Sequence, residues 1–172
     1  GARPFLTDTC TLYKSTRHNA VDHLETAYRH GFTPYVVDAP VIMADGVTSK
    51  CYEEVAVNLK HFASVKIAQA FLSANAMVVL SHFKGHAMGG FGGAIKNISI
   101  GIASSAGKAW IHSAGKTEDT EKLWSSLPAQ DDFLESMAEA AKAIAAHCGE
   151  RILYISVMNN LSVDCDCDAH PE

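Results

Sequence analysis

The chain has 172 residues, of which 48% are hydrophobic and 19% are charged, and this is the composition of a globular domain rather than of a disordered chain. A formal net charge of -5 argues against nucleic acid as the main partner. No apolar run reaches the roughly 20 residues that a membrane-spanning helix needs, so we expect no membrane partner.

Apolar periodicity, caps and turn residues divide the chain into alternating helices and strands. In chain order they predict a helix at 19–31, a strand at 34–45 ending in a turn at Asp45-Gly46, a β-hairpin at 53–68, a short helix at 69–75, a strand at 76–83, a helix at 131–149 and a strand at 151–163. Strands of this almost continuously apolar kind, separated by helices, predict an α/β fold. We expect a mostly parallel sheet flanked by helices, with one β-hairpin.

Three of the predicted strands should share one sheet. We expect 36–42, 76–81 and 152–158 to be neighbouring or near-neighbouring strands, with the 131–147 helix packed on them. The apolar side chains of that helix, which should be buried, include Phe133, Met137 and Ile144.

The first residues, GARPFLTDT, have the pattern of a helix end followed by the start of a strand. We therefore expect residues 1–172 to form a single α/β domain that is part of a larger fold. An N-terminal strand or helix and a C-terminal continuation would lie outside this sequence.

The stretch 81–97, SHFKGHAMGGFGGAIKN, follows the predicted 76–80 strand and contains no acid. Between Val55 and Thr117 there are six lysines and no Asp or Glu, which suits an anionic ligand. A buried segment that merely avoids charge would explain the missing acids but not the six lysines.

Ligands of parallel α/β sheets lie beyond the carboxyl ends of the strands, where this stretch is expected. Its glycines would let backbone N–H groups approach an anion, and a helix beginning at AIKN would favour negative charge. The nucleotide-binding fingerprints do not fit, because a GxGxxG pattern read from Gly90 meets Ile95. Glycines needed only for close packing remain the alternative. The predicted anion-binding residues are Lys84, Gly89, Gly90, Gly92, Gly93, Lys96, Asn97 and Lys108.

Histidines and cysteines could form a metal site near the same strand ends. Five cysteines, an odd number, do not indicate a disulfide framework, and they favour a reducing, cytoplasmic compartment. No CxxC occurs, so the chain encodes no [4Fe–4S] cluster motif. Hydrogen-bonded histidines and a solvated acidic tail are the alternatives. The candidate ligands for zinc or iron are His82, His86, His112, Cys165 and Cys167.

Several segments together resemble a known family: PFLTDTCTLY, NAVDHLETA, VVDAPVIMADG, VVLSHFKGHAMGGFGGAIKNISIG, GKAWIHS, DDFLESMAEAAKA and ILYISVMNNLSVDCDC. They are similar to the bacterial and archaeal family called domain of unknown function 362. The resemblance covers nearly the whole chain and implies an α/β domain that normally continues at both ends. Members are often described as containing an iron–sulfur centre, and many carry a ferredoxin-like module after the segment matching His112-Ser113. Here that position continues directly into AGKTEDTEKLW, so the iron–sulfur label is not carried over.

The patterns therefore support two hypotheses about function. The first is a basic, glycine-rich site for a small anionic ligand in a redox or metal-associated context, with no particular reaction or enzyme class indicated. The second is a non-catalytic domain that docks a ferredoxin-type or other acidic redox protein through the same basic face.

Overall fold

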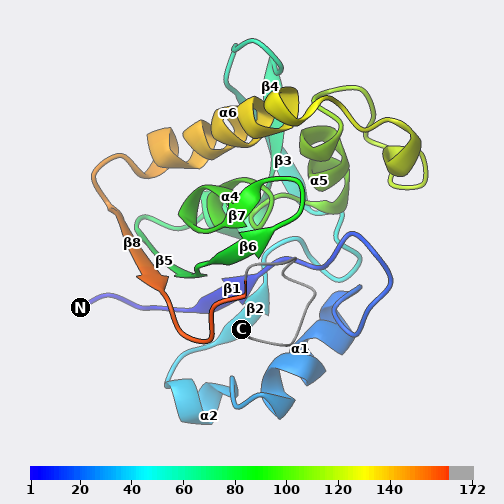
Figure 1. Cartoon of the computed structure of the whole chain (residues 1–172). Coiled ribbons are helices and arrows are strands. Elements are labelled where there is room, and N and C mark those ends of the chain that lie inside the picture. Colours follow the sequence, from blue (N-terminus) through cyan, green and yellow to red (C-terminus); the bar gives the residue numbers. More distant parts are fainter. Residues whose placement is uncertain (163–172) are drawn as a thin grey trace.

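The computed structural model describes residues 1–162, which form an α/β domain (Figure 1). The helices of this part are α1 (Ala20–Arg29), α2 (Pro34–Val37), α3 (Gln69–Leu72), α4 (Ala94–Ser99), α5 (Ser105–His112), the 3-10 helix η1 (Leu123–Ser125) and α6 (Gln130–Cys148). The strands are β1 (Leu6–Asp8), β2 (Val41–Met43), β3 (Tyr52–Ala56), β4 (Ser64–Ala68), β5 (Met77–His82), β6 (Lys84–His86), β7 (Gly90–Gly92) and β8 (Ile152–Val157).

The described strands pair into four two-stranded sheets. Strands β1 and β2 are parallel, as are β5 and β8, whereas β3–β4 and β6–β7 are antiparallel hairpins. The strand pairing is therefore mixed rather than mostly parallel.

Two predicted pairings are confirmed. Strands β5 and β8 run parallel from Met77 opposite Ile152 to His82 opposite Val157, although 69 residues separate them along the chain (152 − 83). Strands β3 and β4 form the predicted hairpin, whose turn places Asn58 in the left-handed region at φ 49°. Asn tolerates that conformation better than most residues.

The prediction that 36–42 joins the sheet of β5 and β8 is wrong. Residues 34–37 form the helical turn α2, because Pro34 occupies its first turn, where a missing N–H costs nothing. Asp38 then takes a left-handed φ of 52° and ends the turn. Only 41–43 remain extended, and these three residues pair with β1 instead of β5.

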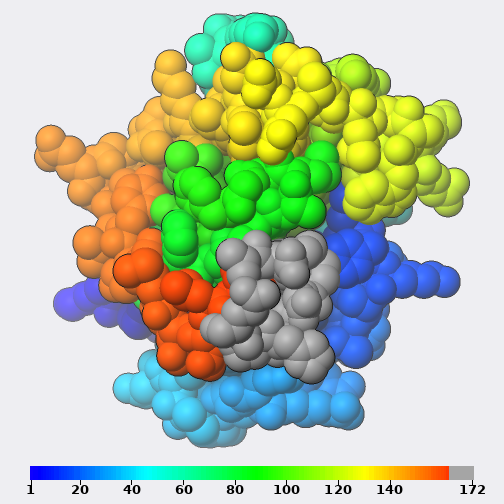
Figure 2. Space-filling view, in the orientation of Figure 1, coloured from blue at the N-terminus to red at the C-terminus, as the bar shows by residue number. Residues whose placement is uncertain are grey.

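Helix α6 covers the core, as expected. Phe133 and Ile144 are fully buried and Met137 is 5% exposed, which confirms the predicted apolar face. The prediction that this helix packs on the strands is wrong, because it packs mainly on α4 and α5, and α4 in turn contacts β5 and β8 (Figure 1). In Figure 2 the green surface of the glycine-rich segment lies between the yellow surface of α6 and the orange-red surface of β8. The segment that the sequence singles out is thus open to solvent on this face.

In the described part of the chain, no helix combines the length and apolar character required to cross a membrane.

Candidate functional site

The glycine-rich segment forms a short hairpin of β6 and β7, which the sequence did not predict. Lys84 pairs with Gly92, and His86 with Gly90, which turns at a φ of +74° that favours glycine. The hairpin follows β5 directly and leads into α4. It therefore projects the side chains of β6 from the carboxyl end of the β5–β8 pair.

Two lysine side chains meet above Gly92. A Cβ atom built on Gly92 would lie 3.5 Å from Cδ of Lys96 and 3.7 Å from Cε of Lys84. Both aliphatic stems therefore pack on the bare backbone of β7. These are ordinary van der Waals distances, so the two lysine stems lie side by side against the backbone at Gly92.

Two histidines contact one aromatic ring of α6. His86 stacks on Phe133 at a ring-centroid distance of 6.4 Å, and His112 of α5 lies 5.5 Å from the same ring. Phe133 is fully buried, so it forms a fixed platform for both imidazoles.

The surroundings keep both imidazoles neutral at physiological pH. Burial, and after it the charges of Lys96, the neighbouring His112 and Lys84, together lower the pKa of His86 to about 4. Burial also lowers the pKa of His112, with Lys96 adding to the effect, while a hydrogen bond to the carbonyl oxygen of Lys108 opposes it. We call Lys84, His86, Lys96 and His112 the His–Lys site.

The low pKa of His86 should make the fold sensitive to acid. The unfolded chain takes up a proton near pH 6.5, whereas the folded chain resists protonation until about pH 4. Stability is therefore retained above pH 6.5 and lost as the pH falls from 6.5 through 4. Because the ring is only half-buried, we expect a contribution of about 1–2 kcal/mol after solvent screening. Chemical denaturation at neutral and acidic pH measures this loss, which should shrink in His86→Phe but not in His82→Gln.

Several predicted site residues have other tasks. Asn97 donates its side-chain amide to the carbonyl oxygen of Leu80 at 3.0 Å and to Oγ of Ser81 at 3.1 Å, which fastens α4 to β5. The N–H of Gly89 donates to Nδ1 of His86. Neither group is left to bind an anion.

Gly93 precedes α4 in extended conformation, and a Cβ there would touch the rings of Phe83 and Phe91. These contacts, 3.4 Å to the ring of Phe83 and 3.8 Å to that of Phe91, are ordinary van der Waals distances and do not require a glycine. Helix α4 has only six residues, so the expected attraction of its first turn for an anion is small.

The ammonium of Lys108 lies apart from the other two lysines. It is buried, and it donates hydrogen bonds to Oγ1 of Thr9 and to the carbonyl oxygen of Ala103. Burial lowers its pKa to about 8, although the carboxylates of Asp45 and Asp8 oppose the shift. Lys108 is therefore part of a different cluster, which we did not predict.

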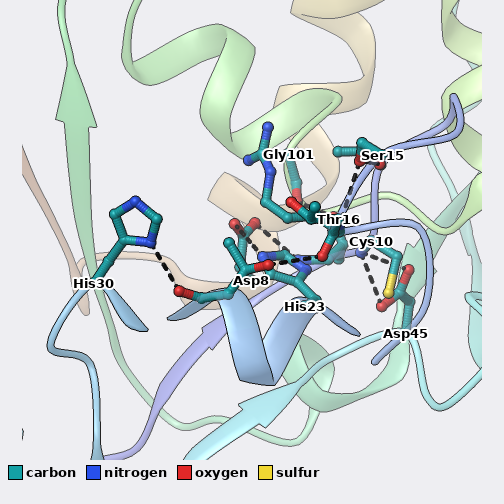
Figure 3. Close-up of polar contacts among 12 residues, drawn as sticks. Asp8, Cys10, Ser15, Thr16, His23, His30, Asp45 and Gly101 are labelled. Carbon is teal, nitrogen blue, oxygen red and sulfur yellow. Dashed lines mark hydrogen bonds and ion pairs between the residues drawn. The ribbon is translucent and has the colours of Figure 1, made fainter. Parts of the chain in front are cut away.

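That cluster, here named the Asp45 cluster, lies at the carboxyl ends of β1 and β2 (Figure 3). Its members are Asp8, Thr9, Cys10, His23, Asp45, Ser49 and Lys108. Asp45 is fully buried, and its carboxylate accepts the N–H of Cys10 at 3.0 and 3.2 Å and the hydroxyl of Ser49. His23 lies 3.6 Å from the carboxylate of Asp8.

The Asp45 cluster stabilises the fold, and its Cys10 thiol is not activated as a nucleophile. Burial and the nearby Asp45 raise the pKa of the Cys10 thiol to about 12, so it stays protonated. Burial lowers the pKa of His23, whose Nδ1 has no hydrogen-bond partner among residues 1–162. The cluster joins the ends of β1 and β2 to α5 through Asp45 and Lys108.

The predicted metal ligands are not assembled in the described part of the chain. His82 turns away, and its Nε2 bonds the carbonyl oxygen of Asn159 at 2.6 Å. Cys165 and Cys167 lie outside the described residues. Within residues 1–162, one other group of three side chains could hold an ion, formed by His61, Asp132 and Glu135.

That group already contains a cation. Nζ of Lys60 lies 2.6 Å from Glu135 and 3.9 Å from Asp132, and Nε2 of His61 lies 2.7 Å from Glu135. Glu139 accepts the N–H groups of His61 and Phe62. The group thus binds the β3–β4 turn to α6 without needing a metal.

Comparison with known proteins agrees with the resemblance noted in the sequence. The profile of the family described as "Domain of unknown function (DUF362)" matches residues 1–172, the whole chain. No curated protein and no solved structure matches the chain. The hairpin, the two lysines and the two histidines are therefore features of a chain that belongs to the DUF362 family.

Proposed function

We propose that the His–Lys site binds a small oxyanion. The observation that carries the proposal is the meeting of Lys84 and Lys96 on Gly92, beside two histidines whose pKa values the lysine charges help to lower. The positive charge of the lysines disfavours protonation of the two imidazoles. The same positive charge attracts a negatively charged ligand. A half-buried position strengthens such contacts relative to those on an open surface.

The metal-associated part of the proposal depends on His112. A neutral imidazole can ligate a metal only through the nitrogen that carries no proton. In His86 that nitrogen, Nδ1, accepts the N–H of Gly89, whereas in His112 Nδ1 donates to the carbonyl oxygen of Lys108 and Nε2 is the nitrogen without a proton. His86 therefore does not fit a metal site, and His82 points elsewhere. The proposal includes a cytoplasmic, redox- or metal-associated setting and no specific reaction.

Replacing Lys96 tests the anion proposal directly. We expect Lys96→Ala to weaken the binding of inorganic phosphate at least about tenfold, because a hydrogen bond to a charged group contributes about 1.5–3 kcal/mol. The free energy of unfolding should change by less than about 0.5 kcal/mol. Lys96→Glu should bind more weakly still, since it adds repulsion. Isothermal titration calorimetry and denaturant melts measure the two quantities.

Lys142→Ala is the matched control, because this lysine is exposed on α6 and lies outside the His–Lys site. It should leave phosphate affinity unchanged. Equal losses of affinity and stability in Lys96→Ala would make Lys96 a structural residue, and an unchanged affinity would contradict the proposal.

A docking role is the second candidate, and the shape of the adjoining surface favours it. An open groove of about 350 Å³ runs past Phe83, Lys84, Gly85, Gly90, Phe91, Leu161 and Ser162. Phe91 is 55% exposed beside the lysine, and a mixed apolar and cationic surface suits an acidic protein such as a ferredoxin-type partner. Docking predicts salt-sensitive binding of an acidic ferredoxin that Lys84→Glu abolishes, together with no saturable binding of phosphate.

A further inference from the structure

One imidazole and two carboxylates converge where the β3–β4 turn meets α6 (Figure 1). Nε2 of His61 lies 2.7 Å from Oε2 of Glu135 and 4.0 Å from Oδ1 of Asp132. Each of the three residues directs one ligand atom to within 4.8 Å of the other two. The three atoms therefore surround one point, and small side-chain shifts would bring all of them to bonding distance from a metal ion. We call His61, Asp132 and Glu135 the turn–helix triad.

The fold holds the members of this triad in place. Asp132 and Glu135 are three residues apart on α6, so they lie on the same face of the helix. Glu139, one turn further along, accepts the backbone N–H groups of His61 and Phe62. The ring of Phe62 is buried in the core, and the His61 side chain is only 9% exposed. The donors are thus largely preorganised, which reduces the entropic cost of binding a ligand.

The ammonium of Lys60 shows that a cation fits between the two carboxylates. Its Nζ lies 2.6 Å from Oε2 of Glu135 and 3.9 Å from Oδ1 of Asp132. The hydrogen bond between Lys60 and Glu135 raises the pKa of the lysine and lowers that of the carboxyl group, so both are charged at neutral pH. The lysine side chain is 65% exposed, and so open an ion pair contributes little to stability. Lys60 is therefore free to move into solvent when a more strongly bound cation replaces it.

We propose that the turn–helix triad binds a divalent transition-metal ion of the zinc class, which displaces the ammonium of Lys60. Zinc binds imidazole nitrogen and carboxylate oxygen, and three protein ligands leave a fourth position for water. In the bound form His61 would ligate through Nε2 and keep its ring proton on Nδ1. Magnesium fits less well, because it prefers oxygen ligands and retains its water. The triad shares no residue with the His–Lys site, so this proposal does not depend on oxyanion binding.

Calorimetric titration of the metal-free, untagged chain with zinc chloride tests the proposal. We expect Asp132→Asn and His61→Gln each to weaken zinc binding at least about tenfold, since even residues that only orient a metal ligand contribute about 10–100-fold. Asp131→Asn is the matched control, because it removes the same charge from the neighbouring, exposed position of α6. It should keep the wild-type affinity. Magnesium chloride should bind at least about tenfold more weakly than zinc.

Lys60→Ala tests the exchange of the ammonium for the metal. This variant should bind zinc about two- to fivefold more tightly than the wild type, because no ion pair has to be broken first. Lys96→Ala, which changes the His–Lys site, should bind zinc as the wild type does. A Lys60→Ala affinity no higher than that of the wild type would overturn the proposal.

A measurement on the wild type alone does not depend on the folding of any variant. Titration with zinc should shift the ring resonances of His61 in a saturable way and leave those of the exposed His147 unchanged. Absence of zinc binding, or equal affinities for zinc and magnesium, would overturn the proposal. So would a zinc affinity that Asp131→Asn lowers as much as Asp132→Asn does, or one that neither His61→Gln nor Asp132→Asn changes.

Discussion

Asp45→Ala is expected to lower the free energy of unfolding by about 3–5 kcal/mol, which is enough to unfold a domain of ordinary stability. The carboxylate of Asp45 is fully buried and accepts the N–H of Cys10 and the hydroxyl of Ser49. Alanine leaves both donors without a partner in a place that water does not reach. It also removes the negative charge that opposes the loss of the Lys108 proton. Urea denaturation followed by circular dichroism measures the loss.

Asp45→Asn separates the hydrogen bonds from the charge. Its amide oxygen can still accept the N–H of Cys10, so the loss should be smaller than in Asp45→Ala. The stability that Asp45→Asn still loses can be compared in two backgrounds, with Lys108 and with Lys108→Met. If the loss comes from the unbalanced charge of Lys108, Asp45→Asn should lower the free energy of unfolding less in the Lys108→Met background. Equal stability of Asp45→Ala and the wild type would show that the cluster does not hold β1 and β2 together.

Met137→Asp should unfold the domain outright. Met137 lies on the buried face of α6 and is 5% exposed. Its Cε would lie 3.4 Å from a Cβ atom built on Gly89. An unpaired carboxylate at this buried position costs several kcal/mol, because it loses its hydration by water. The same change removes the apolar contact between α6 and the β6–β7 turn.

Met137→Leu is the matched control, since it keeps an apolar side chain of similar volume, and it should cost less than about 1.5 kcal/mol. A far-ultraviolet spectrum of Met137→Asp with native helix content and a cooperative melt near the wild-type midpoint would contradict the placement of α6.

The parts of the fold that the sequence predicts correctly are those with strong local signals. Helix α1 follows Asn19, whose side chain accepts the N–H groups of Val21 and Asp22 as a cap. The apolar face of α6 and the turn at Asn58 are equally local. The pairing of β5 with β8 is predictable because long apolar strands joined through helices pair in parallel.

Errors arise where tertiary contacts override local pattern. Val36 and Val37 have high strand propensity, yet Pro34 and the left-handed Asp38 set a helical turn there. The partner of β2 is a three-residue strand whose pairing no pattern in the chain specifies. Lys108 is taken for a surface cation because burial of a lysine cannot be recognised from its neighbours in the sequence.

The candidate site is predictable in composition but not in geometry. The sequence marks Lys84, His86, Lys96 and His112 through the charge asymmetry and the glycines. It does not indicate that His82 faces Asn159 or that Asn97 is used to fasten α4. The Asp45 cluster had a usable signal, because FLTD and VIMAD each place an Asp directly after an apolar run. Applying the rule for strand ends to those two runs would have found it.

The most direct test of the oxyanion site is a phosphate titration followed through the histidine ring resonances of the wild-type chain. An anion held by Lys84 and Lys96 must change the field at His86 and His112, whose pKa values already respond to Lys96. We predict saturable shifts of these two rings with one common affinity, and no such shift for His82 or for the exposed His147 at the end of α6. Shifts that do not saturate, or that are as large at His82 and His147 as at His86 and His112, would contradict the account.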